Sequence, residues 1–154
     1  MTGKGAGLSS DGMKRKRQAV QRTVERVKRI GCQDALEILA QAGGFEIAAM
    51  AGLFLGGVQS HIPVLIDGAI SAAAAYAASQ IDPRVPEFCL ASHRPKEAGG
   101  ALLLNALGLS APVDAGLCLG EGTGAVAVLP LLDMAMAVYE GMGTFTEYEI
   151  PPYE

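Results

Sequence analysis

The sequence predicts an α/β fold, in which helices flank a parallel, Rossmann-like β-sheet and a small helical lobe lies beside it. Short apolar runs alternate with helical patterns from residue 62 onward, and the connections between them are short. Half of the residues are hydrophobic, yet aromatic residues are few and tryptophan is absent. This composition suits helices packed closely on a sheet better than an all-β sandwich. We expect one domain, or a large part of one.

The first thirty residues differ from the rest of the chain in charge. They hold nine of the twelve Lys and Arg residues and only two of the acids. A glycine-rich loop at 2–12 precedes MKRKRQAVQRTVERVKRI at 13–30, whose apolar residues recur at roughly helical spacing. The cluster KRKR is typical of a solvated helix face, or of contact with nucleic acid or an acidic membrane surface. Because aromatic residues for stacking are missing nearby and the remaining chain is acidic, we favour the solvated face.

Two further helices are expected before the first strand. Gly31 ends the basic helix, and DALEILAQA at 34–42 begins a second helix with Asp34 as its N-cap. The segment 43–60 follows a glycine turn and is apolar on nearly every side. We therefore expect a buried third helix there.

The second half of the chain carries the alternation of strands and helices. IPVLIDG at 62–68 is a short β-branched run that ends in Asp-Gly, which is typical of a buried parallel strand. The expected order is strand 62–68, helix 69–81, strand 87–94, helix 96–109, strand 113–120 and helix 123–142. Pro130 either kinks the last helix or marks its first turn.

Each predicted strand ends in polar residues or glycines. In parallel α/β sheets the ligand site lies outside the carboxyl ends of the strands. The polar residues at these ends are Asp67, Ser92, His93 and Glu121. We expect these four residues to converge on one rim of the sheet.

Glu121 is the most informative of the four. Glycines at positions 120, 122 and 124 allow a tight turn and a close approach to a ligand. A carboxylate beside Leu117 and Leu119 would be partly desolvated, which favours proton uptake and suits a general base. The alternative is a glutamate at the start of a helix, stabilised by the helix macrodipole. Local physics leaves both interpretations open.

The loop GKGAG at 3–7 also has two interpretations. It lacks the Walker pattern and follows no strand in this chain, so a dinucleotide fingerprint is not supported. Successive backbone amides without side chains form a good anion nest, and the alternative is a flexible loop. In the first case a lysine of the following helix would turn towards a phosphate.

The sequence offers no metal centre, nucleophile elbow or membrane segment. The three cysteines stand far apart, which is typical of reduced thiols in a cytoplasmic protein. His93 has no second His or Cys at metal spacing, and no Ser or Cys lies in a GxSxG setting. No segment resembles a signal peptide, and the apolar stretches 47–58 and 122–139 are too short or are interrupted by polar residues. We expect a cytoplasmic protein with no nucleic-acid or membrane partner.

Several stretches together resemble the nicotinate-nucleotide–dimethylbenzimidazole phosphoribosyltransferase family. They are TGKGAGLSSDGMKRK, GGFEIAAMAG, PVLIDGAISAAAA, ASHRPKE, LLLNALGL and LGEGTGAVAVLPLLDMA. These stretches cover the chain up to about Thr146, in the order of the family and at similar spacing. The GEGTGA segment is the most specific of them.

The resemblance implies an activity. Members of this family transfer phosphoribose from nicotinate mononucleotide to 5,6-dimethylbenzimidazole, which gives α-ribazole 5′-phosphate and nicotinate for the nucleotide loop of cobamides. A ring nitrogen of the benzimidazole attacks the anomeric carbon as nicotinate leaves, and the resemblance assigns to Glu121 the proton of the other ring nitrogen. Because the nucleotide carries its own pyridinium leaving group, the resemblance implies no metal and no cofactor.

The resemblance also implies a set of substrate-binding residues. Leu119 would line an apolar pocket for the base, and Lys16, or Lys14 in its place, would follow the phosphate loop. The implied positions are Gly3, Gly5, Gly7, Lys16, Glu46, Asp67, Ser92, His93, Leu119, Gly120 and Gly122.

The family's members are much longer than this chain, which resembles their C-terminal half. We expect a glycine-rich phosphate loop at 1–12, a helical segment at 13–42, the C-terminal part of the α/β phosphoribosyltransferase domain at 43–146, and a tail at 147–154. A GEMGIGNTT-like motif and the first strands of the sheet would lie in the other half. The resemblance implies a homodimer, or a partner chain that supplies the N-terminal half, and little activity of this chain alone.

Two alternatives remain beside that interpretation. The chain is one subunit of a two-chain base phosphoribosyltransferase, or it is a non-catalytic nucleotide-binding remnant. Met1 would then mark a true start, whereas a truncated gene or a miscalled start fits the fragment. The DNA immediately before Met1, translated in frame, decides between these origins.

Overall fold

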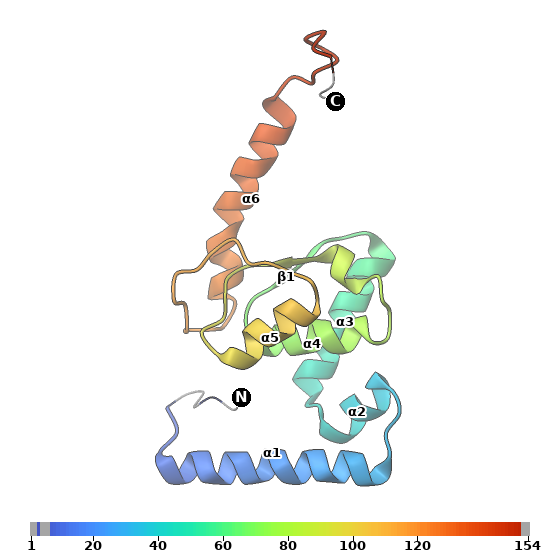
Figure 1. The fold of residues 1–154 in the computed structure, drawn as a ribbon, viewed down its shortest axis with the longest axis vertical. Helices are drawn as coiled ribbons and strands as arrows, with labels where there is room; N and C mark the ends of the chain where they lie inside the picture. The colour runs from blue at the N-terminus through green and yellow to red at the C-terminus, as the bar shows by residue number, and fades with distance from the viewer. Residues whose placement is uncertain (1–2, 4–6, 152–154) are drawn as a thin grey trace.

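The computed structural model describes residue 3 and residues 7–151 of the chain. In chain order its elements are α1 Ser10–Ile30, α2 Ala35–Ala42, α3 Phe45–Ser60, β1 Val64–Ile66, α4 Ala69–Ser79, the 3-10 helix η1 Val85–Phe88, β2 Cys89–Ala91, α5 Ala98–Ala106 and α6 Thr123–Gly141. Figure 1 shows a small sheet surrounded by helices, with α1 at one end of the molecule and α6 at the other. The predicted α/β class with a parallel sheet is confirmed.

Local hydrogen bonds set the ends of the first two helices. The hydroxyl of Ser9 accepts a hydrogen bond from the amide of Gly12 at 3.2 Å, which caps the start of α1. Gly31 ends that helix in the left-handed conformation, with φ at 78°. The carboxylate of Asp34 accepts from the amide of Glu37 at 2.8 Å and caps α2, as the sequence predicts.

The basic residues of α1 face solvent. Lys14, Arg15 and Arg17 are all exposed, whereas Met13 of the same turn is buried. Helix α1 packs against α2, and the guanidinium of Arg26 donates a hydrogen bond to the carbonyl of Gln41. The predicted solvated cationic face is therefore present.

Two parallel strands form the sheet. Val64 lies opposite Cys89, and Ile66 lies opposite Ala91. The amide of Ser92 donates to the carbonyl of Ile66 at 3.1 Å, so the ladder continues to the carboxyl ends of both strands. This arrangement brings the residues that follow each strand to the same edge.

The predicted strand at 113–120 is wrong. In its place the structure has a single parallel bridge between His93 and Val113. Gly116 and Gly120 then take φ angles of 62° and 80°, so the backbone turns instead of extending along the sheet. The connection from α5 to α6 is consequently a loop that touches the sheet at one point.

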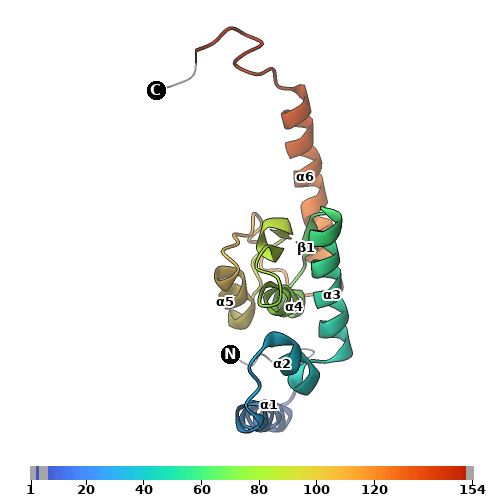
Figure 2. The same cartoon turned by 90° about the vertical axis from the view of Figure 1, so that its right-hand side faces the viewer.

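Helix α4 is the centre of the core. It lies between α3 and α5 in Figure 2 and packs against both of them. Its inward face consists of alanines without solvent exposure, namely Ala72, Ala74, Ala75 and Ala78. Small side chains allow these helices to approach the sheet closely. Burial raises the pKa of the neighbouring Cys89 thiol to about 11, so this thiol is neutral at physiological pH.

The prediction that α3 is buried on all sides is wrong for this chain. Ala51, Phe54 and Val58 belong to the core, but the side chain of Phe45 is 96% exposed and that of Leu53 is 66% exposed. Only one side of α3 packs on α4 and the sheet. An apolar helix is buried only where another element covers it, and composition does not show which sides are covered.

Helix α6 projects away from the rest of the molecule in both views (Figures 1 and 2). Gly124 and Val128, near its start, are its only buried residues. Pro130 lies inside the helix, so the interpretation in which it marks the first turn is wrong. Among the described residues, α6 is the one helix long and apolar enough to cross a membrane by length and composition, and 11% of that segment is buried.

Candidate active site at the strand tips

Asp67 follows β1 directly and holds the start of α6. One oxygen of its carboxylate accepts hydrogen bonds from the amides of Gly124 at 2.8 Å and Ala125 at 3.1 Å. The other oxygen accepts from the amide of Gly122 at 3.1 Å. Asp67 therefore binds the first amides of a helix that begins more than fifty residues later, whose N-cap residue is Gly122. A carboxylate at this position also interacts favourably with the positive end of the helix dipole.

Three consecutive residues before α6 lie in the left-handed region. The φ angles are 80° at Gly120, 56° at Glu121 and 81° at Gly122. The two glycines adopt this conformation freely, whereas for a residue with a side chain it costs roughly 1–2 kcal/mol. Thr123 closes the turn, because its amide and its hydroxyl donate to the carbonyl of Gly120 at 3.1 and 2.7 Å.

The turn carries Glu121 at an exposed point. Glu121 and its neighbour Leu119 are both exposed, the latter by 79%. The prediction that apolar neighbours desolvate Glu121 is therefore wrong for this chain by itself. Leu117 is only half-buried, and α6 leads away from the turn instead of folding over it.

Ser92 and His93 follow β2 at the same edge. The Ser92 side chain is fully buried, and its hydroxyl oxygen lies 2.7 Å from the carbonyl oxygen of Ile66 and 3.0 Å from that of Asp67. The same oxygen lies 3.1 Å from Nδ1 of His93. A carbonyl can only accept, so the single hydroxyl proton is directed at one of them. Whether Nδ1 of His93 donates or accepts in its contact with Ser92 depends on the tautomer of the ring.

His93 and Asp67 leave no space for a side chain at position 124. A Cβ atom on Gly124 would overlap the His93 ring and would lie 2.9 Å from a carboxylate oxygen of Asp67. The first turn of α6 thus rests directly on the two strand tips. The predicted convergence holds for Asp67, Ser92, His93 and the backbone that carries Glu121.

The amides at the start of α6 have no capacity left for an anion. Those of Gly122, Gly124 and Ala125 donate to Asp67, and that of Thr123 donates to Gly120. A helix N-terminus binds phosphate only where its amides are free. An anion bound near the strand tips would therefore need partners other than these amides.

The N-terminal loop provides one candidate for that role. The ammonium of Lys16 donates a hydrogen bond to the carbonyl of Gly3 at 2.9 Å. A Cβ atom on Gly3 would overlap the carboxylate of Glu97, so Gly3 lies against the residue before α5. Gly7 has φ at 82°, and Gly5 lies outside the described residues. Sequence reasoning does not predict Glu97 for this region, and the sequence gives no local signal for it.

Glu46 is separate from the hydrogen bonds that connect the described residues at the strand tips. It lies exposed in the first turn of α3, and among the described residues no hydrogen bond or ion pair joins it to Asp67, Ser92 or His93. Within the same described part of the chain, no group of three or more His, Cys, Asp and Glu side chains could hold a metal ion.

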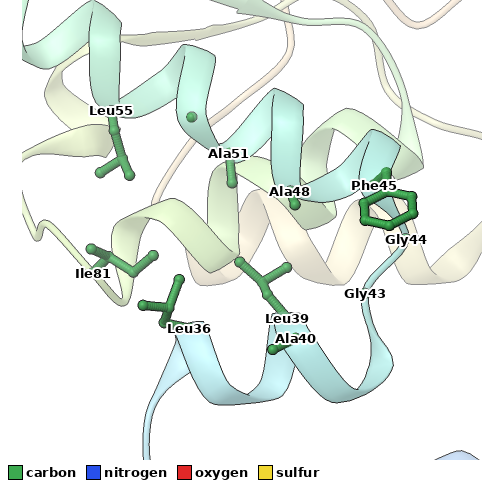
Figure 3. Close-up of a pocket in the computed structure, with 11 residues that line it drawn as sticks. Leu36, Leu39, Ala40, Gly43, Gly44, Phe45, Ala48, Ala51, Leu55 and Ile81 are labelled. Atoms are coloured by element: carbon green, nitrogen blue, oxygen red, sulfur yellow. The ribbon is translucent and has the colours of Figure 1, made fainter.

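A cavity of about 550 Å³ lies elsewhere, between α2 and α3 (Figure 3). Its lining is apolar and includes Leu36, Leu39, Phe45 and Leu55. It contains no titratable side chain, so it offers no acid or base for catalysis. The chemistry-bearing residues are at the strand tips, not in this cavity.

The residues that sequence reasoning missed at the strand tips are Thr123 and Ala125, and for Gly124 it missed the contact with Asp67. The predicted role of Asp67 was contact with substrate, whereas its carboxylate accepts hydrogen bonds from the backbone amides of Gly122, Gly124 and Ala125. An acid after one strand and a glycine in the first turn of a later helix are the only signals available. They point to this pairing only when the topology is already known.

Comparison with known proteins shows the family of this chain. A family model described as "Phosphoribosyltransferase" matches residues 1–150. The chain is 40% identical over 154 residues to a nicotinate-nucleotide–dimethylbenzimidazole phosphoribosyltransferase of Acetivibrio thermocellus, covering 100% of this chain and 44% of the relative. It is 44% identical over 147 residues to the enzyme of that name from Chromobacterium violaceum, covering 96% of this chain and 42% of the relative.

A solved structure has the same fold. The crystal structure of CobT from Thermus thermophilus superposes with a TM-score of 0.86 at 38% identity, covering 98% of this chain and 44% of that one. The chain thus spans less than half the length of the proteins it matches. The features exposed here, α6 among them, occur within a fold shared with much longer chains.

Proposed function

We propose a function for this chain, which belongs to the phosphoribosyltransferase family. It supplies the part that carries the general base in an enzyme that transfers phosphoribose from nicotinate mononucleotide to 5,6-dimethylbenzimidazole. The products are α-ribazole 5′-phosphate and nicotinate. The observation that carries the proposal is the anchored turn that presents Glu121 at the strand tips. The names of the relatives supply the substrate class.

Glu121 acts as the general base in this proposal. One nitrogen of the benzimidazole attacks the anomeric carbon of the ribose, and the bond from that carbon to the pyridine nitrogen of nicotinate breaks. The other ring nitrogen loses its proton to the Glu121 carboxylate. A fixed backbone and an accessible carboxylate suit this role, because a base must meet the proton it abstracts at hydrogen-bond distance.

The pocket for the benzimidazole ring is completed by residues outside this chain. Leu119 presents an exposed apolar side chain two residues before Glu121, as one wall of an aromatic site would. Since the relatives are more than twice as long, their additional residues supply the opposite wall. That wall also desolvates Glu121, which favours proton uptake by the carboxylate.

Lys16 and the glycine loop bind the phosphate in this proposal. The Lys16 ammonium has three donors, and its one recorded bond goes to the carbonyl of Gly3. Among the described residues Lys16 has no second hydrogen-bond partner, so its remaining donors are available to an anion. Gly120 and Glu46 remain proposed substrate contacts, whereas Gly122, Ser92 and His93 support the turn from within the fold.

The assembly is the remaining part of the proposal. We propose a cytoplasmic enzyme that works as a homodimer, or together with a partner chain that supplies the N-terminal half. The exposed apolar surface of α6 supports contact with further protein. On the domain scale, residues 43–146 contribute the C-terminal part of a Rossmann-like domain that the N-terminal half completes.

The test uses a chimera in which this chain replaces the corresponding C-terminal part of the Acetivibrio thermocellus relative. We expect the chimera to release nicotinate from nicotinate mononucleotide in the presence of dimethylbenzimidazole, and the isolated chain to release little. Glu121→Gln in the chimera should lower kcat by about two or more orders of magnitude, because it removes the general base.

Glu87→Gln is the matched control, since it makes the same change at an exposed position before β2. This variant should retain the rate of the unmodified chimera. Equal rates of the Glu121→Gln and Glu87→Gln chimeras would refute the base role. A folded chimera without any activity would favour the non-catalytic remnant.

A further inference from the structure

Asp67 uses its hydrogen-bonding capacity inside the fold. A carboxylate has about four lone-pair sites, and amides occupy three of those of Asp67. Its carbonyl also lies within hydrogen-bond distance of the buried Ser92 hydroxyl, at 3.0 Å. The side chain is half-buried below the turn. The hydrogen bonds of Asp67 therefore go to the backbone of the same chain, and little of its carboxylate is left for a ligand.

The anchored amides lie on the C-terminal side of Glu121. Gly122 is the next residue, and Gly124 and Ala125 begin the helix that follows. Glu121 is exposed and in a left-handed conformation, so the place of its carboxylate depends on the turn. That conformation persists only where the surroundings fix it. The surroundings that fix it are Asp67 on one side and the Thr123–Gly120 bonds on the other.

We propose that Asp67 is a positioning residue, whose carboxylate fixes the 120–125 turn and thereby places the carboxylate of Glu121. The role of Glu121 as base rests on the proposed function, whereas the anchoring of the turn does not. The sequence-based prediction, in which Asp67 contacts substrate, has a different consequence. A substrate contact affects KM, and a positioning residue affects kcat.

The anchoring is measured in the isolated 154-residue chain by NMR. In the unmodified chain, scalar couplings across hydrogen bonds should connect the Asp67 carboxylate carbon with the amide nitrogens of Gly122, Gly124 and Ala125. This measurement needs no variant. Couplings absent from all three amides, while those within α4 are observed, would overturn the proposal.

Asp67→Asn then tests the consequence for the turn. Asparagine has the same shape but replaces one acceptor oxygen with an N–H donor, which meets amides that also donate. Amide hydrogen exchange at 121–125 should become about tenfold faster or more, because fewer hydrogen bonds resist local opening. Asp82→Asn is the matched control, because Asp82 also accepts a backbone hydrogen bond, from the amide of Arg84 at 3.0 Å, but before η1. Unchanged exchange at 121–125 in Asp67→Asn would overturn the proposal.

The chimera tests the link to Glu121. Asp67→Asn should lower kcat by about ten- to a hundredfold, as misplacement of a catalytic group does, and should leave KM for nicotinate mononucleotide nearly unchanged. In a Glu121→Gln background the same change should have little further effect, because the two residues act as a unit. Additive losses, or a raised KM with unchanged kcat, would overturn the positioning role.

The two proposals fail in different ways. If Glu121→Gln has no effect on the active chimera, the proposed function of Glu121 is wrong, while the NMR results still decide whether Asp67 anchors the turn. If Glu121→Gln abolishes the rate and Asp67→Asn does not alter it, the base role holds and the positioning role is wrong.

Discussion

At the scale of the residue, Glu121 combines a conformation that glycine prefers with a side chain that glycine lacks. Its φ of 56° lies between two left-handed glycines, and within the described part of the chain no hydrogen bond or ion pair of its carboxylate is recorded. A side chain there costs roughly 1–2 kcal/mol relative to a relaxed backbone. Backbone strain of this kind lowers the stability of the chain, and it is commonly found at functional sites.

This conformation leads to a comparison of two substitutions at position 121. We expect Glu121→Gly to be more stable than Glu121→Ala by about 1 kcal/mol, because glycine adopts the left-handed region without a steric penalty. Urea unfolding of the isolated chain, followed by circular dichroism, measures the difference. An alanine variant as stable as the glycine variant would show that the backbone at 121 is relaxed.

At the scale of the element, the close contact between α3 and β1 depends on one glycine. A Cβ atom on Gly57 would lie 2.6 Å from a methyl group of Val64 and 2.9 Å from the carbonyl oxygen of Ile62. Gly52 lies in the same helix, and a Cβ atom there would meet nothing within 4 Å. The two positions therefore separate packing from helix propensity.

We expect opposite effects of alanine at these positions. Gly57→Ala should destabilise the chain by about 1–3 kcal/mol through overpacking. Gly52→Ala should stabilise it by about 0.5–1 kcal/mol, because alanine is the better helix former. Denaturant unfolding measures both, and a stabilising Gly57→Ala would contradict the close approach of α3 to β1.

At the scale of the whole molecule, α6 is a long apolar helix that buries only two of its residues, Gly124 and Val128. Its exposed apolar side chains are Val126, Leu129, Leu131, Met134, Met136, Val138 and Tyr139. Monomeric proteins rarely leave an apolar patch of this extent in water. The longer relatives have additional chain with which such a surface can be covered.

The chimera allows this coverage to be measured. We expect the amides of α6 from about Val128 onward to exchange more slowly in the chimera than in the isolated chain, because packing suppresses local opening. Mass spectrometry of peptides from both proteins gives the comparison, with peptides of α4 as the internal control. Equal exchange of α6 in the two proteins would place its partner outside the added half.

The sequence identified most helices from their caps and periodicity. Asp34 and Gly31 act within a few residues of where they stand, so their effects follow from local chemistry alone. The strand at 113–120 was wrong for the converse reason. Pairing depends on a neighbouring strand, and two left-handed glycines turn the chain away after one bridge.

For the candidate site, the sequence by itself determined the two strands β1 and β2, the glycine-flanked Glu121 and the edge at which Asp67, Ser92 and His93 meet. These features follow from local patterns and from the geometry of parallel sheets. Only the tertiary structure decided that Asp67 binds the amides of 122, 124 and 125 and that Glu121 is exposed. Partners more than fifty residues apart leave no periodic signal, because their contact depends on how every element between them packs.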